Sequence, residues 1–290
     1  MRQYTIAGHT IHISGKRLGS LPGFVHFLSD NQASEPLLII DTDAAVEDWS
    51  LSPVFTSEYE DVSYDLSVKD SAYLIRMKQQ DDCFLLAEIS PEGNCFHAAV
   101  SRTGIFSNYS LHYLCWLLFG IAALSRQTVS IHSSAATVHG KTVLFLGESG
   151  TGKSTHTGLW LKHIPDTELL NDDSPFIRVE AGGDIQVYGS PWSGKTACYK
   201  NKHTPVAAFV RLSQAPHNRI RRLKGIEAIG EVLPSCPFTF AYENRLSESI
   251  YSILSQTLQQ TPVYHLECLP DDGAVDLVYS TLIQDKFLCG

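Results

Sequence analysis

The sequence predicts an α/β protein with a β-rich N-terminal region, and three observations lead to this prediction. Short apolar or β-branched runs, separated by Gly, Pro, Asp and Ser, are typical of strands and recur through residues 1–105. A glycine-rich segment at 147–154 lies between an apolar run and a stretch with helical spacing. The rest of the chain contains both strand and helix patterns. We therefore expect two domains, residues 1–105 and 106–290.

Composition indicates a globular protein and excludes several classes of partner. Hydrophobic residues make up 43% and charged residues 18% of the 290 residues, as in ordinary soluble proteins. The formal net charge of −9 argues against general binding to nucleic acid or to a membrane surface, because an acidic body repels phosphate polymers. The seven cysteines form no C-x-x-C pair, so free thiols in a reducing compartment fit best.

Two hydrophobicity signals argue against membrane targeting. The N-terminal Met1-Arg2-Gln3-Tyr4 lacks the apolar core of a signal peptide. The most hydrophobic segment, Leu111 to Leu124, is shorter than the roughly 20 apolar residues that span a bilayer, so a buried helix is the better interpretation. We expect a cytoplasmic protein with no membrane partner.

The first 105 residues contain strand patterns but no recognisable catalytic motif. The expected strands lie at 4–6, 10–13, 37–40 and 84–89. This region is interpreted as a small β-rich domain or an elaboration of the main sheet. A module that docks the acceptor is the functional alternative, and the sequence does not separate the two.

The second part of the chain is expected to begin with a long apolar helix over about 110–126. Gly182-Gly183-Asp184 between two apolar runs predicts a hairpin. The helix at 244–259 is amphipathic, because its apolar residues recur on one face. The expected strands are 129–132, 142–146, 176–179, 185–188, 206–212 and 263–266, and the further helices are 154–164 and 274–283.

Residues Gly147 to Ser154 form a complete G-x-x-x-x-G-K-S motif, which predicts a phosphate-binding loop. The glycines let successive N–H groups point at one anion at the positive end of a helix. Lys153 is expected to reach the β- and γ-phosphates, and the Ser154 hydroxyl to bind Mg²⁺. The alternative is a glycine-rich turn that binds nothing, but the strand before and the helix after the motif favour the nucleotide. The expected ATP contacts are Gly147, Ser149, Gly150, Thr151, Gly152, Lys153, Ser154 and Thr155, together with Arg219 from later in the chain.

The segment Glu168 to Asp173 predicts a strand that ends in two adjacent acids. Beside a phosphate loop, one carboxylate can hold Mg²⁺ while the other takes the proton of an acceptor. The alternative is that Asp172 and Asp173 only begin a turn before Ser174-Pro175. Their position after the loop favours the functional interpretation.

Three further features are weaker indications of a functional role when each is taken alone. Lys195, in the Gly/Ser/Pro-rich turn at 189–196, is a reasonable clamp for phosphate or an anionic acceptor, and a surface turn is equally acceptable. His132 stands alone, and a lone histidine is more often structural than catalytic. Arg219 lies in a basic stretch at 211–224 that is typical of a solvated edge strand, with phosphate or adenine binding as the minority option.

Taken in order, these segments resemble the superfamily of HPr kinase/phosphorylase and ATP-dependent phosphoenolpyruvate carboxykinase, and most closely its small HPr-kinase-like members. The resemblance rests on Ile131-His132-Ser133, Gly147 to Thr155, Asn171-Asp172-Asp173, Tyr188 to Lys195 and Asn218-Arg219-Ile220. It implies a phosphate-loop core of that fold, with His132 near the transferred phosphate. It also implies Asp172 as a metal ligand, Asp173 as the general base and Lys195 as a phosphate or substrate contact, and it raises the chance of a homo-oligomer.

Two differences from the pattern of this superfamily narrow the expected activity. The glycine-rich signature that follows the acidic pair in HPr kinases is not visible, and the chain is much shorter than a carboxykinase. We expect an ATP- and Mg²⁺-dependent kinase that acts on a hydroxyl, most plausibly serine in a peptide, a protein or the free amino acid. The alternatives are a non-catalytic ATP-binding regulatory module, and a carboxykinase-like or ATP-hydrolysing enzyme.

Overall fold

The computed structural model describes residues 1–15, 21–30, 35–59, 62–79, 82–102 and 108–288. Its contacts divide the chain into two compact units. The first comprises Met1–Arg126 and Thr239–Ser247, and the second comprises Gln127–Phe238 and Glu248–Gly290. This division falls at Arg126/Gln127, whereas the sequence placed a domain boundary at 105/106.

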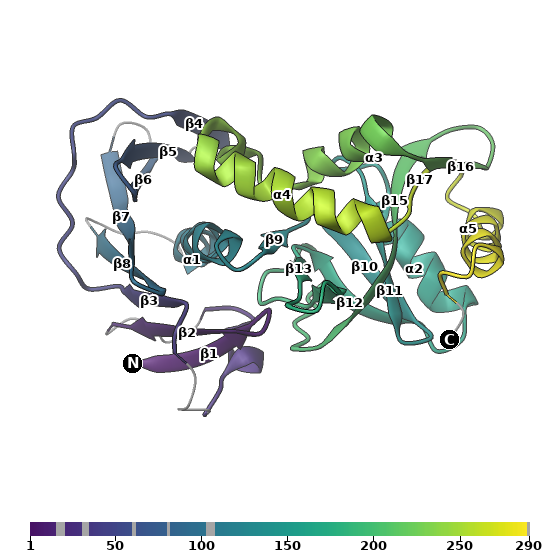
Figure 1. The fold of residues 1–290 in the computed structure, drawn as a ribbon, viewed down its shortest axis with the longest axis horizontal. Coiled ribbons are helices and arrows are strands. Elements are labelled where there is room, and N and C mark those ends of the chain that lie inside the picture. Colours follow the sequence, from purple (N-terminus) through teal and green to yellow (C-terminus); the bar gives the residue numbers. More distant parts are fainter. Residues whose placement is uncertain (16–20, 31–34, 60–61, 80–81, 103–107, 289–290) are drawn as a thin grey trace. The chain divides into compact units, whose positions relative to one another are not determined.

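The first unit is built on a mixed sheet, which contains eight strands among the described residues (Figure 1). Neighbouring strands are antiparallel except at β2–β3 and β3–β8, which are parallel. In sheet order the strands are β1 (Arg2–Ile6), β2 (His9–Ser14), β3 (Leu38–Asp41), β8 (Cys95–Arg102), β7 (Asp82–Glu92), β6 (Ala72–Gln79), β5 (Val62–Lys69) and β4 (Phe55–Tyr59).

Helix α1 (Asn108–Leu124) is the predicted apolar helix, and it packs within the first unit. The ring of Tyr113 lies 5.6 Å from that of Tyr64 on β5. His112 contacts Phe24 of the short 3₁₀ helix η2 (Phe24–Phe27) with ring centroids 5.7 Å apart. These contacts explain why α1 belongs with the residues before it in the chain, although the sequence assigned it to the second domain. Among the described helices, none is long and apolar enough to cross a membrane.

The second unit is built on another mixed sheet, to which the described residues contribute nine strands. Its main path is β12 (Glu168–Asp173), β10 (Ser133–Val138), β11 (Lys141–Leu146), β15 (His203–Gln214), β14 (Ile185–Tyr188), β13 (Phe176–Val179) and β9 (Thr128–Ser130). The long strand β15 also pairs with β17 (Val263–Cys268), which pairs in turn with β16 (Arg219–Leu223). The predicted hairpin is confirmed as β13 and β14.

One face of this sheet is covered by helices α2 (Lys153–His163) and α5 (Asp272–Gln284). Trp160 of α2 is fully buried against Phe145 of β11, with ring centroids 5.2 Å apart. The same core contains Val210 of β15 and Leu266 of β17. The second unit also contains α3 (Gly225–Val232) and the 3₁₀ helix η3 (Leu233–Ser235). The 3₁₀ helix η4 (Phe238–Tyr242) falls mostly in the first unit, and α4 (Asn244–Gln260) begins in the first unit and ends in the second.

The structure contains elements that the sequence analysis did not predict. Strands β4, β5, β6 and β8 were missed in the first unit, and β10 and α3 in the second. The expected strand at 129–132 is shorter, because β9 ends at Ser130 and β10 begins at Ser133. Cys83, Cys95, Cys115, Cys198, Cys236 and Cys268 are free thiols, as expected, and Cys289 lies outside the described residues.

Candidate functional site

The glycine-rich loop connects the end of β11 at Leu146 to the start of α2 at Lys153. Gly150 and Gly152 have φ angles of 84° and 101°, which side chains rarely allow. A Cβ on Gly147 would lie 2.3 Å from Thr151 Oγ1, so glycine is required there as well. Gly152 caps α2 without a side-chain hydrogen bond, which leaves the first N–H groups of the helix available to a ligand. Glu148, Ser149 and Gly150 are exposed.

Lys153 folds back over this loop. Its Nζ donates hydrogen bonds to the backbone oxygens of Gly147 at 2.8 Å and Glu148 at 3.1 Å. Burial lowers the pKa of Lys153, opposed by Asp173, and the nearby positive charge of Arg211 lowers it further. Burial and Arg211 thus disfavour the charged form of the Lys153 ammonium, and an anion bound at the loop would stabilise it.

The two acids at the end of β12 point in opposite directions, as successive residues of a strand do. Asp172 faces α2, because the Ser154 hydroxyl donates a hydrogen bond of 3.0 Å to Asp172 Oδ1. Asp173 pairs across the sheet with Ser133, which pairs with Leu146, and Leu146 pairs with Arg211. Asp173 therefore belongs to the opposite face of the sheet. The Ser174 hydroxyl donates to Asp173 Oδ2 at 2.8 Å.

His132 reaches this edge because β10 runs antiparallel between β11 and β12. The start of β10 therefore meets the ends of both neighbours, and His132 directly precedes it. Its Nε2 lies 3.7 Å from Asp173 Oδ1, and its side chain is 46% exposed. Partial burial lowers the pKa of His132, and Lys153 lowers it further, whereas Asp173 opposes the shift. His132 is thus neutral at pH 7, and the contact with Asp173 is not an ion pair there.

The turn that carries Lys195 lies along the outer edge of β12. Ser193 pairs with Asp173, and the Gly194 N–H donates to the Asp172 backbone oxygen at 2.6 Å. A Cβ on Gly194 would lie 2.9 Å from that oxygen, so the turn approaches β12 as closely as backbone allows. Lys195 itself is exposed, one residue from this contact.

Asn171 fixes this turn to the strand that bears the acids. It is completely buried. Its Nδ2 lies 3.1–3.4 Å from the backbone oxygens of Ser190, Trp192 and Cys198 and from Ser190 Oγ. Its Oδ1 accepts the Ser174 N–H at 2.9 Å. One amide therefore connects the turn to both sides of the acidic pair, a role that the sequence analysis did not assign.

Arg211 is a second residue that the sequence analysis did not place in the site. It pairs with Leu146, the last residue before the loop. Its guanidinium lies 3.9 Å from Glu148 Oε1 and 3.5 Å from Glu231 Oε2, and its side chain is 14% exposed. The sequence offered a partial indication of this position, since Arg211 falls near the end of the expected strand at 206–212. Only the parallel pairing of β11 and β15 places it beside the loop.

The predicted site residues thus fall into two groups. The loop, Asp172, Asp173 and His132 meet at one edge of the sheet, with Lys195 in the adjoining turn. Arg219 lies apart from them on β16, separated from β15 by β17. It lines a pocket of ≈ 260 Å³ with Arg221, His265 and Glu267.

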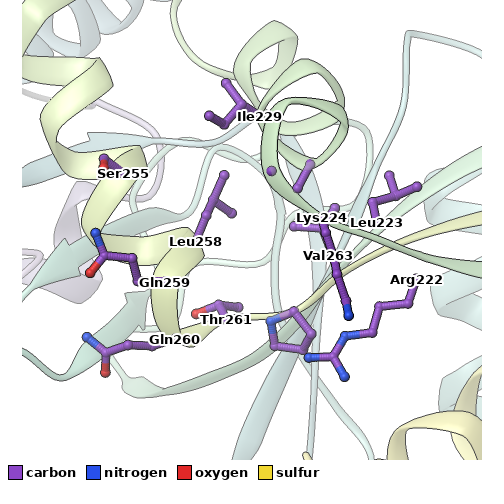
Figure 2. Close-up of a pocket in the computed structure, with 13 residues that line it drawn as sticks. Arg222, Leu223, Lys224, Ile229, Ser255, Leu258, Gln259, Gln260, Thr261 and Val263 are labelled. Carbon is purple, nitrogen blue, oxygen red and sulfur yellow. The ribbon is translucent and has the colours of Figure 1, made fainter.

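A larger pocket of ≈ 410 Å³ lies at the other end of the β16–β17 pair, where Leu223 pairs with Val263 (Figure 2). It is formed by the start of α3, the end of α4 and the start of β17, where Val263 is the first strand residue. Leu258 and Ile229 give it apolar surface, and Arg222 and Lys224 bring positive charge to its rim. None of the predicted site residues lines this pocket.

Comparisons with known proteins leave the family open. No protein-family model matches the chain, and no curated protein matches it. Among solved structures, it is similar to the HPr(Ser) kinase/phosphatase from Coxiella burnetii, with 13% sequence identity and a TM-score of 0.32 over 55% of this chain and 90% of that one. At this level the likeness is weak, and it establishes neither a shared detailed fold nor an activity.

Proposed function

We propose that this protein is an ATP- and Mg²⁺-dependent kinase that transfers the γ-phosphoryl group to a serine hydroxyl in a peptide, a protein or the free amino acid. The observation that supports it is the separation of Asp172 and Asp173 onto opposite faces of β12, beside one glycine-rich loop. One carboxylate can then bind a metal ion while the other accepts a proton. A loop that only connected a strand to a helix would need neither.

The donor atoms around Ser154 fit Mg²⁺. This ion prefers hydroxyl, carboxylate and phosphate oxygens in a regular octahedron, in which neighbouring oxygens lie about 3 Å apart. Ser154 Oγ and Asp172 Oδ1 are 3.0 Å apart and face the start of α2. Bound there, Mg²⁺ would neutralise charge on the nucleotide phosphates.

The remaining residues would hold ATP and move the proton. The open N–H groups of the loop and of α2 suit phosphate oxygens, and Lys153 and Arg211 add positive charge beside them. Asp173 would accept the proton of the serine hydroxyl as its oxygen bonds to the γ-phosphorus and ADP leaves. Because burial lowers the pKa of His132, its ring adds little positive charge beside Asp173 at pH 7. We further propose that Lys195 contacts the acceptor or the moving phosphoryl group.

The proposal is tested by following the label from γ-labelled ATP in a fractionated cell extract with Mg²⁺. Asp173→Asn serves as the inactive variant. Asp184→Asn is the matched control, because it removes the same charge from an exposed turn. Label on a specific acceptor, lost in Asp173→Asn and kept in Asp184→Asn, is expected. Label found only as free phosphate would indicate a hydrolase, and ATP binding without consumption would indicate a regulatory module.

A further inference from the structure

A hydrogen-bonded chain of Ser213, His265 and Glu231 lies outside the candidate site. His265 Nε2 lies 2.8 Å from Ser213 Oγ, and His265 Nδ1 lies 3.1 Å from Glu231 Oε1. The three residues come from β15, β17 and α3. A carboxylate only accepts hydrogen bonds, so Nδ1 is the donor toward Glu231, and in that tautomer Nε2 accepts the Ser213 hydroxyl. This is the arrangement in which a histidine, oriented by an acid, activates a serine as a nucleophile.

The same face of the sheet carries a pocket suited to a phosphoryl group. His265 lines this ≈ 260 Å³ pocket together with Arg219, Arg221 and Glu267. Ser213 pairs with Glu267, which pairs with Arg219, so Ser213 and Arg219 lie two strands apart, or about 10 Å. Guanidinium groups present a planar fork of donors that matches phosphate oxygens. Arg221 already donates to Glu227 at 2.8 Å, whereas Arg219 is exposed at the pocket.

Ser213 also lies close to the glycine-rich loop. It lies two residues after Arg211, and Arg211 pairs with Leu146 at the end of β11. From the spacing of residues along and between strands, the Cα atoms of Ser213 and Leu146 are about 8 Å apart. The neighbouring Gln214 donates through Nε2 to the Gly150 backbone oxygen at 3.3 Å. The serine is therefore positioned between the loop and the arginine-lined pocket.

We propose that Ser213 is a phosphoryl acceptor within this protein, which the protein modifies with its own bound ATP; this inference rests on the proposed kinase function. Ser213 Oγ forms a bond to the γ-phosphorus, the bond from that phosphorus to its bridging oxygen breaks, and ADP leaves. The hydroxyl proton passes to His265 Nε2, while Glu231 keeps the hydrogen bond from Nδ1. Arg219 holds the oxygens of the new phosphoserine.

Two reactions test this proposal on the full chain. The first is incubation with Mg²⁺ and ATP, read by peptide mass spectrometry. The second is incubation with a fluorophosphonate probe, which labels activated serines without needing ATP. Both are run on wild type, Ser213→Ala, His265→Gln and Ser280→Ala. The last removes an exposed serine on α5 that is bonded only to its own helix, and serves as the control. Thermal unfolding confirms that each variant is folded.

Ser213 is expected to be modified in both reactions in wild type and in Ser280→Ala. Loss of the base in His265→Gln should slow both reactions by at least about 100-fold, as general-base removal typically does. The proposal is overturned if the protein turns over ATP while Ser213 carries no phosphate, whether or not the probe labels it. If ATP is not turned over, the kinase function fails. Probe labelling of Ser213 that depends on His265 would then support Ser213 as an activated nucleophile and exclude ATP as its phosphoryl donor.

Discussion

Replacing Asn171 by Asp tests whether one buried amide holds the acidic strand end and the Lys195 turn together. Asp has nearly the same shape as Asn and keeps the acceptor for the Ser174 N–H. It loses the Nδ2 donors that lie 3.1–3.4 Å from oxygens of Ser190, Trp192 and Cys198. A second acceptor oxygen then faces other acceptors in a site that water does not reach.

The size of the effect follows from the donor count. An Asn side chain has only two N–H groups, so two of these contacts can be hydrogen bonds at any moment. Each buried acceptor left without a donor costs about 1–3 kcal/mol, so the expected loss is about 3 kcal/mol. For a unit of this size, that loss lowers Tm by about 6–12 °C.

Thermal and urea unfolding of Asn171→Asp measure this loss, with Asn201→Asp as the control. Asn201 is exposed in the loop before β15, and its replacement changes the net charge equally. If the two variants unfold with free energies within about 0.5 kcal/mol of each other, as surface substitutions do, the anchoring role of Asn171 is wrong. Folded Asn171→Asp is also expected to turn ATP over more slowly than wild type, because the turn and the acids lose their common anchor.

Three further predictions concern acid stability, the turn and the loop. His156 is buried with its pKa lowered to about 4 from 6.5 by burial, so it contributes stability that is complete above pH 6.5 and lost as pH falls toward 4. This loss is about 3 kcal/mol, and urea unfolding from pH 7 to pH 4 should show it in wild type but not in His156→Gln. Gly194→Ala, whose Cβ would lie 2.9 Å from the Asp172 oxygen, should lower kcat more than it weakens ATP binding, while Gly182→Ala, which meets open space, should change neither. Lys153→Met should abolish ATP binding measured by calorimetry, whereas the exposed Lys162→Met should retain it.

Strand and helix patterns predicted the main elements of the second unit well where the local signal was strong. The helix at α2, the strand before it and the β13–β14 hairpin are confirmed, because apolar periodicity and glycine turns specify them locally. Strands β5 and β6 were missed because polar and charged residues such as Asp65 and Arg76 interrupt their apolar pattern. In the structure these side chains are buried and paired, Arg76 with Asp48 and Asp65 with Lys78. Such pairing depends on residues far away in sequence, which no local pattern contains.

Prediction of the candidate site from sequence is limited in the same way, by its dependence on residues that are distant along the chain. The glycine motif and the adjacent acids identified the loop and the end of β12, and the alternation of a strand already implied opposite directions for Asp172 and Asp173. The sequence could not show which acid faces α2, since that depends on which side of the sheet the helix packs. It could not show Arg211 beside the loop or Ser213 against His265 and Glu231.

The sequence by itself therefore determined the mixed α/β class, the glycine-rich loop and its neighbouring acids, because each depends on interactions between residues close along the chain. Tertiary structure alone decided the rest. The antiparallel insertion of β10 brings His132 to Asp173, and the parallel pairing of β11, β15 and β17 aligns Arg211 with His265. Strand order and register are set by burial of a shared core, and that burial sums contacts across the whole sheet.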